Sequence, residues 1–289
     1  MSSLWIPRAG GRSSPGRCAL TVLVLLCMIC CAEGRRAEQN PDILCTTTLI
    51  AGMVESLAAG DLAVHSLIPP GSCPGHFDLR PRDAMSLSEA KVILRHDYQR
   101  YLDDKLSAQN PSLTIESLAS VGHLSIPANY LHVLSQVRGV LARHYPHLKA
   151  NLNLNYEAAV SQIKGVERNV QARAVGMGLG RTPVLASAMQ AEFLTWLGLE
   201  VVGTFPDSPD ELSVRRLREL VRIARRTGAR AVVGNLQSDT ERVARTIGQE
   251  IGLPVCMLSN FPGTNESNGT YAGLLLDNTN RLAHTLSTP

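Results

Sequence analysis

The chain of 289 residues carries 28 Lys and Arg against 25 Asp and Glu, and 44% of its residues are hydrophobic. With only 18% charged residues the chain can bury a large core, so it is not an intrinsically disordered protein as a whole. A formal net charge of +3 gives little attraction to a polyanion, so nucleic-acid binding is not favoured. The length suits one large domain or two lobes.

The first 34 residues have the pattern of a signal peptide for export. Arg8, Arg12 and Arg17 precede an apolar run over residues 19–31, which is too short to span a membrane comfortably. We therefore expect residues 1–34 to be absent from the mature protein, which would be periplasmic or exposed on the cell surface.

The cysteines separate into those of the leader and those of the body. Cys30 and Cys31 end the apolar run, so lipid anchoring at one of them is the alternative to simple cleavage near the end of the leader. Beyond the leader only Cys45, Cys73 and Cys256 remain, and three cysteines cannot all pair.

Short apolar runs alternate with helical stretches from residue 41 onward, which is typical of βα units that stack helices on a parallel sheet. The first such region, residues 41–126, is predicted to be an N-terminal α/β lobe. Its predicted strands are 42–49, 62–68 and 113–118, and its predicted helices are 50–59 and 86–106.

Residues 127–180 differ, because they hold apolar residues at helical spacing and no strand pattern. We predict two helices here, of which the second, residues 147–173, would be about 40 Å long and could reach from one lobe to another. Gly176, Gly178 and Gly180 follow it and precede a predicted strand, so a flexible lobe junction is favoured over a phosphate-binding loop.

The βα rhythm resumes over residues 181–289, which we predict to be a C-terminal α/β lobe. Its predicted strands are 183–187, 199–204, 229–236 and 254–259, and its predicted helices are 189–197, 209–227, 239–251 and 270–286. The predicted fold is therefore α/β, with two βα lobes joined by a long connecting helix and a cleft between them.

Three segments carry a resemblance to a known family. Residues 48–54 and 66–83, the latter with the motif Pro-Pro-Gly-Ser-Cys-Pro-Gly-His, look like the first lobe of the zinc- and manganese-type periplasmic solute-binding proteins of ABC importers, and residues 196–205 are similar to a passage of the second lobe. The resemblance extends from about residue 41 to the end. It implies two lobes joined by a rigid helix, with a divalent ion, Zn or Mn, held between them by histidines and carboxylates.

The resemblance assigns two ligands to the first lobe. His76 matches the family's histidine in the Pro-rich loop after the second strand, and neutral imidazole is a good ligand for Zn²⁺ or Mn²⁺. His123 lies one position from the family's second histidine, just before the helix that begins at Pro127. The alternative for both is a solvated loop histidine. His65, His96, His132, His144, His147 and His284 lie in strand or helix patterns and are given no role.

The second lobe departs from the family pattern. Residues 186–190 offer no imidazole or carboxylate where the family has a ligand, and Asn260 stands where the family has an aspartate. Glu266, in the loop 263–269, is the nearest carboxylate that could complete the site, with a solvated loop charge as the alternative. A site of His76, His123, Asn260 and Glu266 would be weaker than the usual one, or differently selective.

Four further residues are predicted to line the cleft. Asn235 and Gln237 follow a strand at the edge where α/β proteins bind ligands, and Ser187 ends another predicted strand. Cys73 lies three residues before His76, a spacing that could chelate a soft metal from one loop. The favoured alternative is a small buried thiol on a turn.

The sequence shows neither a nucleophile elbow nor a His-Glu-x-x-His helix, so we do not expect an enzyme. We expect an exported, monomeric solute-binding protein that captures a divalent transition metal and delivers it to the membrane permease of an ABC transporter. The alternatives are capture of a non-metal small solute in the same cleft, and an extracellular adhesin or scaffold that has lost transport.

Overall fold

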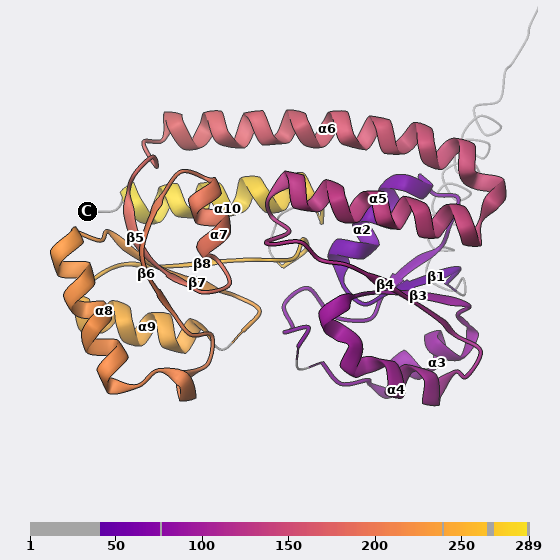
Figure 1. The fold of residues 1–289 in the computed structure, drawn as a ribbon, viewed down its shortest axis with the longest axis horizontal. Helices are drawn as coiled ribbons and strands as arrows, with labels where there is room; N and C mark the ends of the chain where they lie inside the picture. Colours follow the sequence, from indigo (N-terminus) through magenta and orange to yellow (C-terminus); the bar gives the residue numbers. More distant parts are fainter. Residues whose placement is uncertain (1–40, 76, 239, 265–268, 288–289) are drawn as a thin grey trace, which may run out of the picture. The chain divides into compact units, whose positions relative to one another are not determined.

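The computed structural model describes residues 41–287 apart from 76, 239 and 265–268, and residues 41–289 form one compact unit. The predicted leader, residues 1–34, lies outside the described residues. Two parallel sheets, each with its own helices, form two α/β lobes within this unit, as predicted (Figure 1). No described helix is both long enough and apolar enough to cross a membrane.

The sheets have the same strand order. The first runs β2-β1-β3-β4 and the second β6-β5-β7-β8, with all neighbours parallel. The first sheet contains β1 (Ile43–Cys45), β2 (Val64–Ser66), β3 (Val92–His96) and β4 (Thr114–Leu118). The second contains β5 (Pro183–Ser187), β6 (Glu200–Phe205), β7 (Ala231–Asn235) and β8 (Val255–Leu258). In each, strand order reverses beside the first strand, and α/β sheets bind ligands at the carboxyl ends there.

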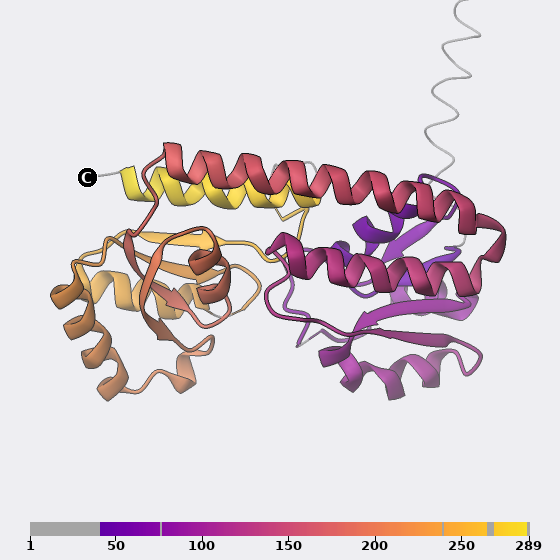
Figure 2. The ribbon, with the colours of Figure 1, turned by 45° about the horizontal axis from the view of Figure 1, so that its top comes forward.

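A layer of four helices covers one face of both sheets. It comprises α2 (Thr48–Ala58), α5 (Pro127–His144), α6 (Lys149–Gly176) and α10 (Tyr271–Ser287). At 1.5 Å per residue the 28-residue α6 is about 42 Å long, and it packs on α2, α5 and α10. Figures 1 and 2 show α6 running over both lobes with α10 beside it. The predicted long connecting helix is confirmed.

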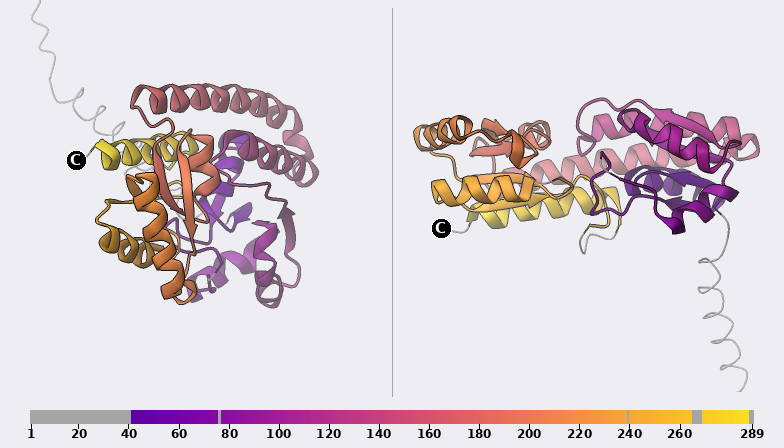
Figure 3. Two further views of the ribbon diagram at one scale, coloured as in Figure 1. Left: turned by 60° about the vertical axis from the view of Figure 1, so that its left-hand side comes forward. Right: turned by 90° about the horizontal axis from the view of Figure 1, so that it is seen from below.

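Shorter helices cover the opposite faces. The first lobe has α3 (Pro81–Glu89), α4 (Asp103–Gln109) and a 3-10 turn at Asp97–Leu102. The second has α8 (Val214–Thr227) and α9 (Thr240–Ile251) on the side away from α10, while α7 (Ala191–Trp196) follows β5 (Figure 3). Further 3-10 turns occupy Pro146–Leu148 and Pro209–Glu211.

Strand alternation divides the apolar side chains between these layers, because successive residues of a strand point to opposite faces. Ile43 and Cys45 face the core under α6, while Leu44 between them faces the separate core under α3 and α4. In the second sheet Val184 joins the core under α6 and Leu185 joins that of α8 and α9. One continuous core therefore extends beneath α6 through both lobes.

The predicted helix over residues 86–106 is wrong. Only its two ends are helical, and β3, Val92–His96, lies between them as a fully buried strand paired with β1 and β4. The charged residues around it suggested an exposed helix, but Arg95 is buried because Asp103 neutralises its guanidinium at 2.5 Å. Burial in the middle of the sheet therefore overrides the polar pattern.

Cys45, Cys73 and Cys256 are all free thiols, whereas the odd count required only that one of them be unpaired. Cys45 and Cys256 are buried in the shared core, and burial raises the pKa of both thiols, that of Cys256 to about 11. Cys73 is half-buried in the loop after β2.

Gly248 on α9 tests the packing of the second lobe. A Cβ there would lie 2.6 Å from Val255 Cγ2 and 2.9 Å from the Leu253 carbonyl oxygen, so Gly248→Ala should lower the free energy of unfolding by roughly 1–3 kcal/mol. Gly165→Ala on α6 is the matched control, because a Cβ there would lie 3.9 Å from the Arg168 side chain, an ordinary contact distance. This substitution should raise the free energy of unfolding by about 0.5–1 kcal/mol. Urea denaturation measures both, and equal effects would contradict this packing.

Candidate functional site

A cavity of about 450 Å³ lies between the lobes, at the carboxyl ends of strands from both sheets. The first lobe contributes Leu49, Cys73, Pro74, Gly75, Tyr98, Ser120, Gly122, His123, Leu124 and Ser125. The second contributes Ala188, Met189, Glu192, Asn235, Gln237, Ser238, Asn260 and Phe261. Among these described lining residues Glu192 carries the one formal charge, so the walls are nearly neutral.

His123 and Asn260 meet across this cavity. The backbone N–H of Ser125 donates to His123 Nδ1 at 3.1 Å, so the ring proton belongs on Nε2, which lies 3.1 Å from Asn260 Oδ1 and donates to it. Burial lowers the pKa of His123 to about 4, so the imidazole is neutral at pH 7. Both ring nitrogens are therefore engaged in hydrogen bonds.

The loop that carries His123 is held by the opposite lobe. Glu192, on α7, accepts from the His123 backbone N–H at 2.7 Å and from Asn129 Nδ2 at 3.5 Å. Asn129 also donates to the His123 carbonyl oxygen at 3.1 Å. Gly122 has φ +65°, and a Cβ there would lie 2.6 Å from both Asn129 and Glu192, so the close approach requires glycine. Both carboxylate oxygens of Glu192 are thus in use.

Uncharged amides surround Asn260. Gln190 Nε2 donates to Asn260 Oδ1 at 2.7 Å, and the Asn260 backbone N–H donates to Gln237 Oε1 at 2.8 Å. Gln237 Nε2 in turn donates to the Pro70 carbonyl oxygen of the first lobe and to Ser259 Oγ, both at 2.9 Å. Hydrogen bonds between neutral groups therefore connect the lobes at this point.

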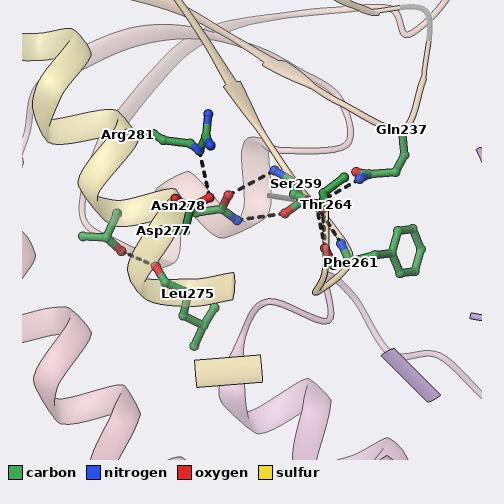
Figure 4. A network of polar contacts seen from close by, with 9 residues as sticks. Gln237, Ser259, Phe261, Thr264, Leu275, Asp277, Asn278 and Arg281 are labelled. Atoms are coloured by element: carbon green, nitrogen blue, oxygen red, sulfur yellow. Dashed lines mark hydrogen bonds and ion pairs between the residues drawn. The ribbon is translucent and has the colours of Figure 1, made fainter. Parts of the chain in front are cut away.

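Helix α10 fixes the loop after β8, as Figure 4 shows. The fully buried Asn278 accepts from the Ser259 backbone N–H at 3.0 Å and donates to the Ser259 carbonyl oxygen at 2.8 Å. Ser259 Oγ donates to the Phe261 carbonyl oxygen and also contacts Thr264 Oγ1. The position of Asn260 is consequently set by the same helical layer that joins the lobes.

The structure brings together one pair of the four predicted ligands, His123 and Asn260. His76 and Glu266 lie outside the described residues. Within the described part of the chain, no group of three or more His, Cys, Asp or Glu side chains is arranged to hold a metal ion. The described half of the site is therefore an imidazole and an amide.

Of the predicted cleft-lining residues, Cys73, Asn235 and Gln237 line the cavity. Ser187 is fully buried at the end of β5 and is not among the lining residues. Sequence reasoning missed the roles of Gln190 and Glu192. Both lie at the start of the helix predicted at 189–197, just beyond the strand predicted at 183–187, and this nearness to the binding edge of the sheet was the available signal.

Residues 43–285 match the family described as zinc-uptake complex component A, periplasmic. The chain is 28% identical over 74 residues to the metal ABC transporter substrate-binding lipoprotein SloC of Streptococcus mutans, which is 26% of this chain and 24% of that protein. It is 24% identical over 179 residues to a putative metal-binding protein of Thermotoga maritima, covering 59% of this chain and 67% of the relative. The chain thus spans about a quarter of the length of the first of these relatives.

Solved structures show the same fold. The crystal structure of ZnuA superposes with a TM-score of 0.70 at 18% identity, covering 86% of this chain and all of that one. The Mn-bound periplasmic metal-binding protein of Candidatus Liberibacter asiaticus gives 0.69 at 14% identity, covering 84% and 98%.

His96, beside the site, should make the stability depend on pH. Its ring is fully buried between Thr47 Oγ1 and Ser120 Oγ, and burial lowers its pKa to about 4, against 6.5 ordinarily. Between pH 6.5 and 4 the histidine is protonated in the unfolded chain and neutral in the folded chain. Proton uptake therefore favours the unfolded chain, and the free energy of unfolding falls by roughly 3 kcal/mol as the pH decreases from above 6.5 to 4. His96→Gln should remove the part of this decrease in the free energy of unfolding that His96 causes.

Urea denaturation from pH 7.5 to 4 measures this slope. His147→Gln, at an exposed position, is the control and should keep the wild-type profile. A His96→Gln profile as steep as the wild type would show that His96 does not cause the loss.

Proposed function

Because the chain belongs to the family of periplasmic metal-binding components of zinc-uptake complexes, we propose that it captures a divalent transition metal, Zn²⁺ or Mn²⁺, between its lobes. The observation that carries the proposal is the approach of His123 Nε2 to Asn260 Oδ1 at 3.1 Å from opposite lobes. Two ligands that are each about 2.1 Å from a tetrahedral ion are about 3.4 Å apart, so this pair needs little movement to share one.

Metal capture would replace the hydrogen bond between these two side chains. To bind an ion, Nε2 must present a lone pair, so the ring proton moves to Nδ1 and the Ser125 N–H loses its acceptor. An exchanged hydrogen bond costs about 1 kcal/mol, which is small beside the binding of a metal by several ligands. His76 and Glu266 are proposed as the further ligands.

An ion held by both lobes stabilises their closed arrangement, which is the form that a transporter can recognise. We propose that the mature protein is exported, monomeric, and delivers its ion to the membrane permease of an ABC transporter. Relatives named as substrate-binding lipoproteins support the cell-surface location, with lipid attachment at Cys30 or Cys31 as the alternative to a soluble periplasmic form. Such proteins bind and transport a substrate and do not transform it.

One observation favours a second candidate, the capture of a small organic solute. The described walls of the cavity are uncharged except for Glu192, whose oxygens are engaged, and neutral polar walls suit an uncharged molecule.

The ligand role of His123 can be measured directly. On chelator-stripped protein, His123→Ala should weaken Zn²⁺ or Mn²⁺ binding at least tenfold, because one of a few ligands is lost. His147→Ala removes an exposed histidine elsewhere and should leave the affinity unchanged. Isothermal titration calorimetry with each metal gives the two affinities. Equal affinity in both variants would refute His123 as a ligand, and no binding to the wild type would refute metal capture.

A further inference from the structure

A second cavity, of about 340 Å³, lies among helices α2, α5 and α6 and the start of α10. Leu49 lines both this cavity and the one beside His123, so the two cavities adjoin at that side chain. Helices α2 and α5 belong to the first lobe, whereas Pro262 and Tyr271 belong to the second. A molecule in this cavity would therefore contact both lobes and the connecting helix at once.

We propose that this cavity binds a small organic amine in its ammonium form, with the ammonium group at Glu55 and an apolar body between the helices. The inference goes beyond the proposed function and does not depend on it, because neither His123 nor Asn260 lines this cavity.

Small residues keep this cavity open. Gly52 lies in the interior of α2 and lines the cavity, although glycine is less favourable than alanine inside a helix. A Cβ on Gly52 would meet no heavy atom within 4 Å, so close packing does not require a glycine there. Ala159 on α6 and Ala272 on α10 leave further room. The space available to a ligand explains these small residues where packing does not.

A buried hydroxyl group without a partner is an independent sign of a ligand. Tyr271 lines the cavity and is only 6% exposed, and its hydroxyl forms no hydrogen bond within the described structure. The ring is held in place by stacking on Tyr130, with 3.8 Å between the ring centroids. A buried polar group that stays unpaired is costly, and an ammonium N–H that donates to the Tyr271 oxygen would remove this cost.

Glu55 gives the cavity a negative charge. Its carboxylate forms no ion pair or hydrogen bond with the described residues, and burial raises its pKa, so a cation beside it would stabilise the ionised form. No Lys, Arg or His is among the described lining residues. Residues 265–268, which precede the lining residue Gly269 in the chain, are Asn-Glu-Ser-Asn and add no positive charge. The cavity therefore favours a cation over an anion.

The size and the remaining walls indicate an organic cation. A volume of about 340 Å³ lies within the range of roughly 300–1,000 Å³ that is typical of pockets for small organic molecules. Leu49, Leu134, Ile163 and the Tyr130 ring give the cavity an apolar wall. An inorganic cation would leave this apolar surface uncovered, whereas an amine with an apolar body would cover it.

Phenethylamine, 2-phenylethanol and phenylacetate are the probes. They share a phenyl ring and a short chain, but near neutral pH the first is a cation, the second is neutral and the third is an anion. Isothermal titration calorimetry on the chelator-stripped wild type should show phenethylamine binding roughly tenfold or more tightly than 2-phenylethanol, because only the amine can pair with Glu55. Phenylacetate should not bind.

Each other outcome overturns the inference. If 2-phenylethanol binds as tightly as phenethylamine, the protein does not recognise the ammonium group and the proposed class of ligand is wrong. If phenylacetate binds as tightly as phenethylamine, the argument from the charge of Glu55 is wrong. If none of the three binds, the cavity is not a site for an organic amine. Metal capture by His123 is measured separately and stands or falls independently of these results.

Two polar variants test the contacts of the ammonium group. Glu55→Gln removes the charge and keeps the shape, so it should weaken phenethylamine binding roughly tenfold or more. Tyr271→Phe keeps the stacked ring and removes the hydroxyl, so it should weaken binding roughly threefold or more. Glu157→Gln, at an exposed position of α6 outside the cavity, is the matched control and should bind as the wild type does. Wild-type affinity in Glu55→Gln would refute the inference.

Three further variants locate the amine. Gly52→Leu places a side chain in the open space and should weaken phenethylamine binding roughly tenfold or more. Gly139→Leu, inside α5 but outside the cavity, is its matched control. Ala188→Leu narrows the cavity beside His123 and should leave phenethylamine binding unchanged.

Circular dichroism melts establish that these variants are folded, and Glu55→Gln decides the question if Gly52→Leu is not. If Ala188→Leu abolishes binding while Gly52→Leu does not, the amine occupies the cavity beside His123 and the inference is wrong.

Discussion

The core beneath α6 is the constraint on which the arrangement of the site depends. Apolar residues of both sheets and of α2, α5, α6 and α10 belong to one buried cluster, which includes the stacked rings of Tyr130 and Tyr271, 3.8 Å apart at their centroids. A core shared in this way resists separation of the lobes, because opening them exposes apolar area to water. The carboxyl ends of the two sheets are consequently held close enough for single side chains to bridge them.

The lobes are bridged at the site by hydrogen bonds between uncharged side chains, and these bonds determine the geometry of the site. Each neutral hydrogen bond contributes only about 1 kcal/mol, whereas a buried amide left without a partner costs about 1–3 kcal/mol. The contacts of Gln190, Gln237 and Asn260 therefore specify geometry more than they add stability. Asn260 itself is neutral, so it does not bring to a dication the charge that an aspartate at this position would bring.

The sequence predicted the fold well wherever local pattern and tertiary environment agree. The helices near α5, α6 and α10 and all four strands of the second sheet follow from apolar spacing and turn residues. Strand β3 could not be predicted, because the ion pair that allows Arg95 to be buried comes from Asp103, in a helix after the strand. Likewise, Asn260 could be named from the resemblance, but its contact with His123 joins residues 137 apart in sequence and needed the fold.

The burial of two of the three described thiols has a consequence for their reactivity. The thiolate is the form that reacts, and the raised pKa values of Cys45 and Cys256, together with their burial, keep both unreactive in the folded state. Cys73 alone among the three stands half-buried at the cavity wall. Within the described part of the chain, Cys73 therefore offers a fluorophore or spin label one attachment point, placed where it would sense what enters the cleft.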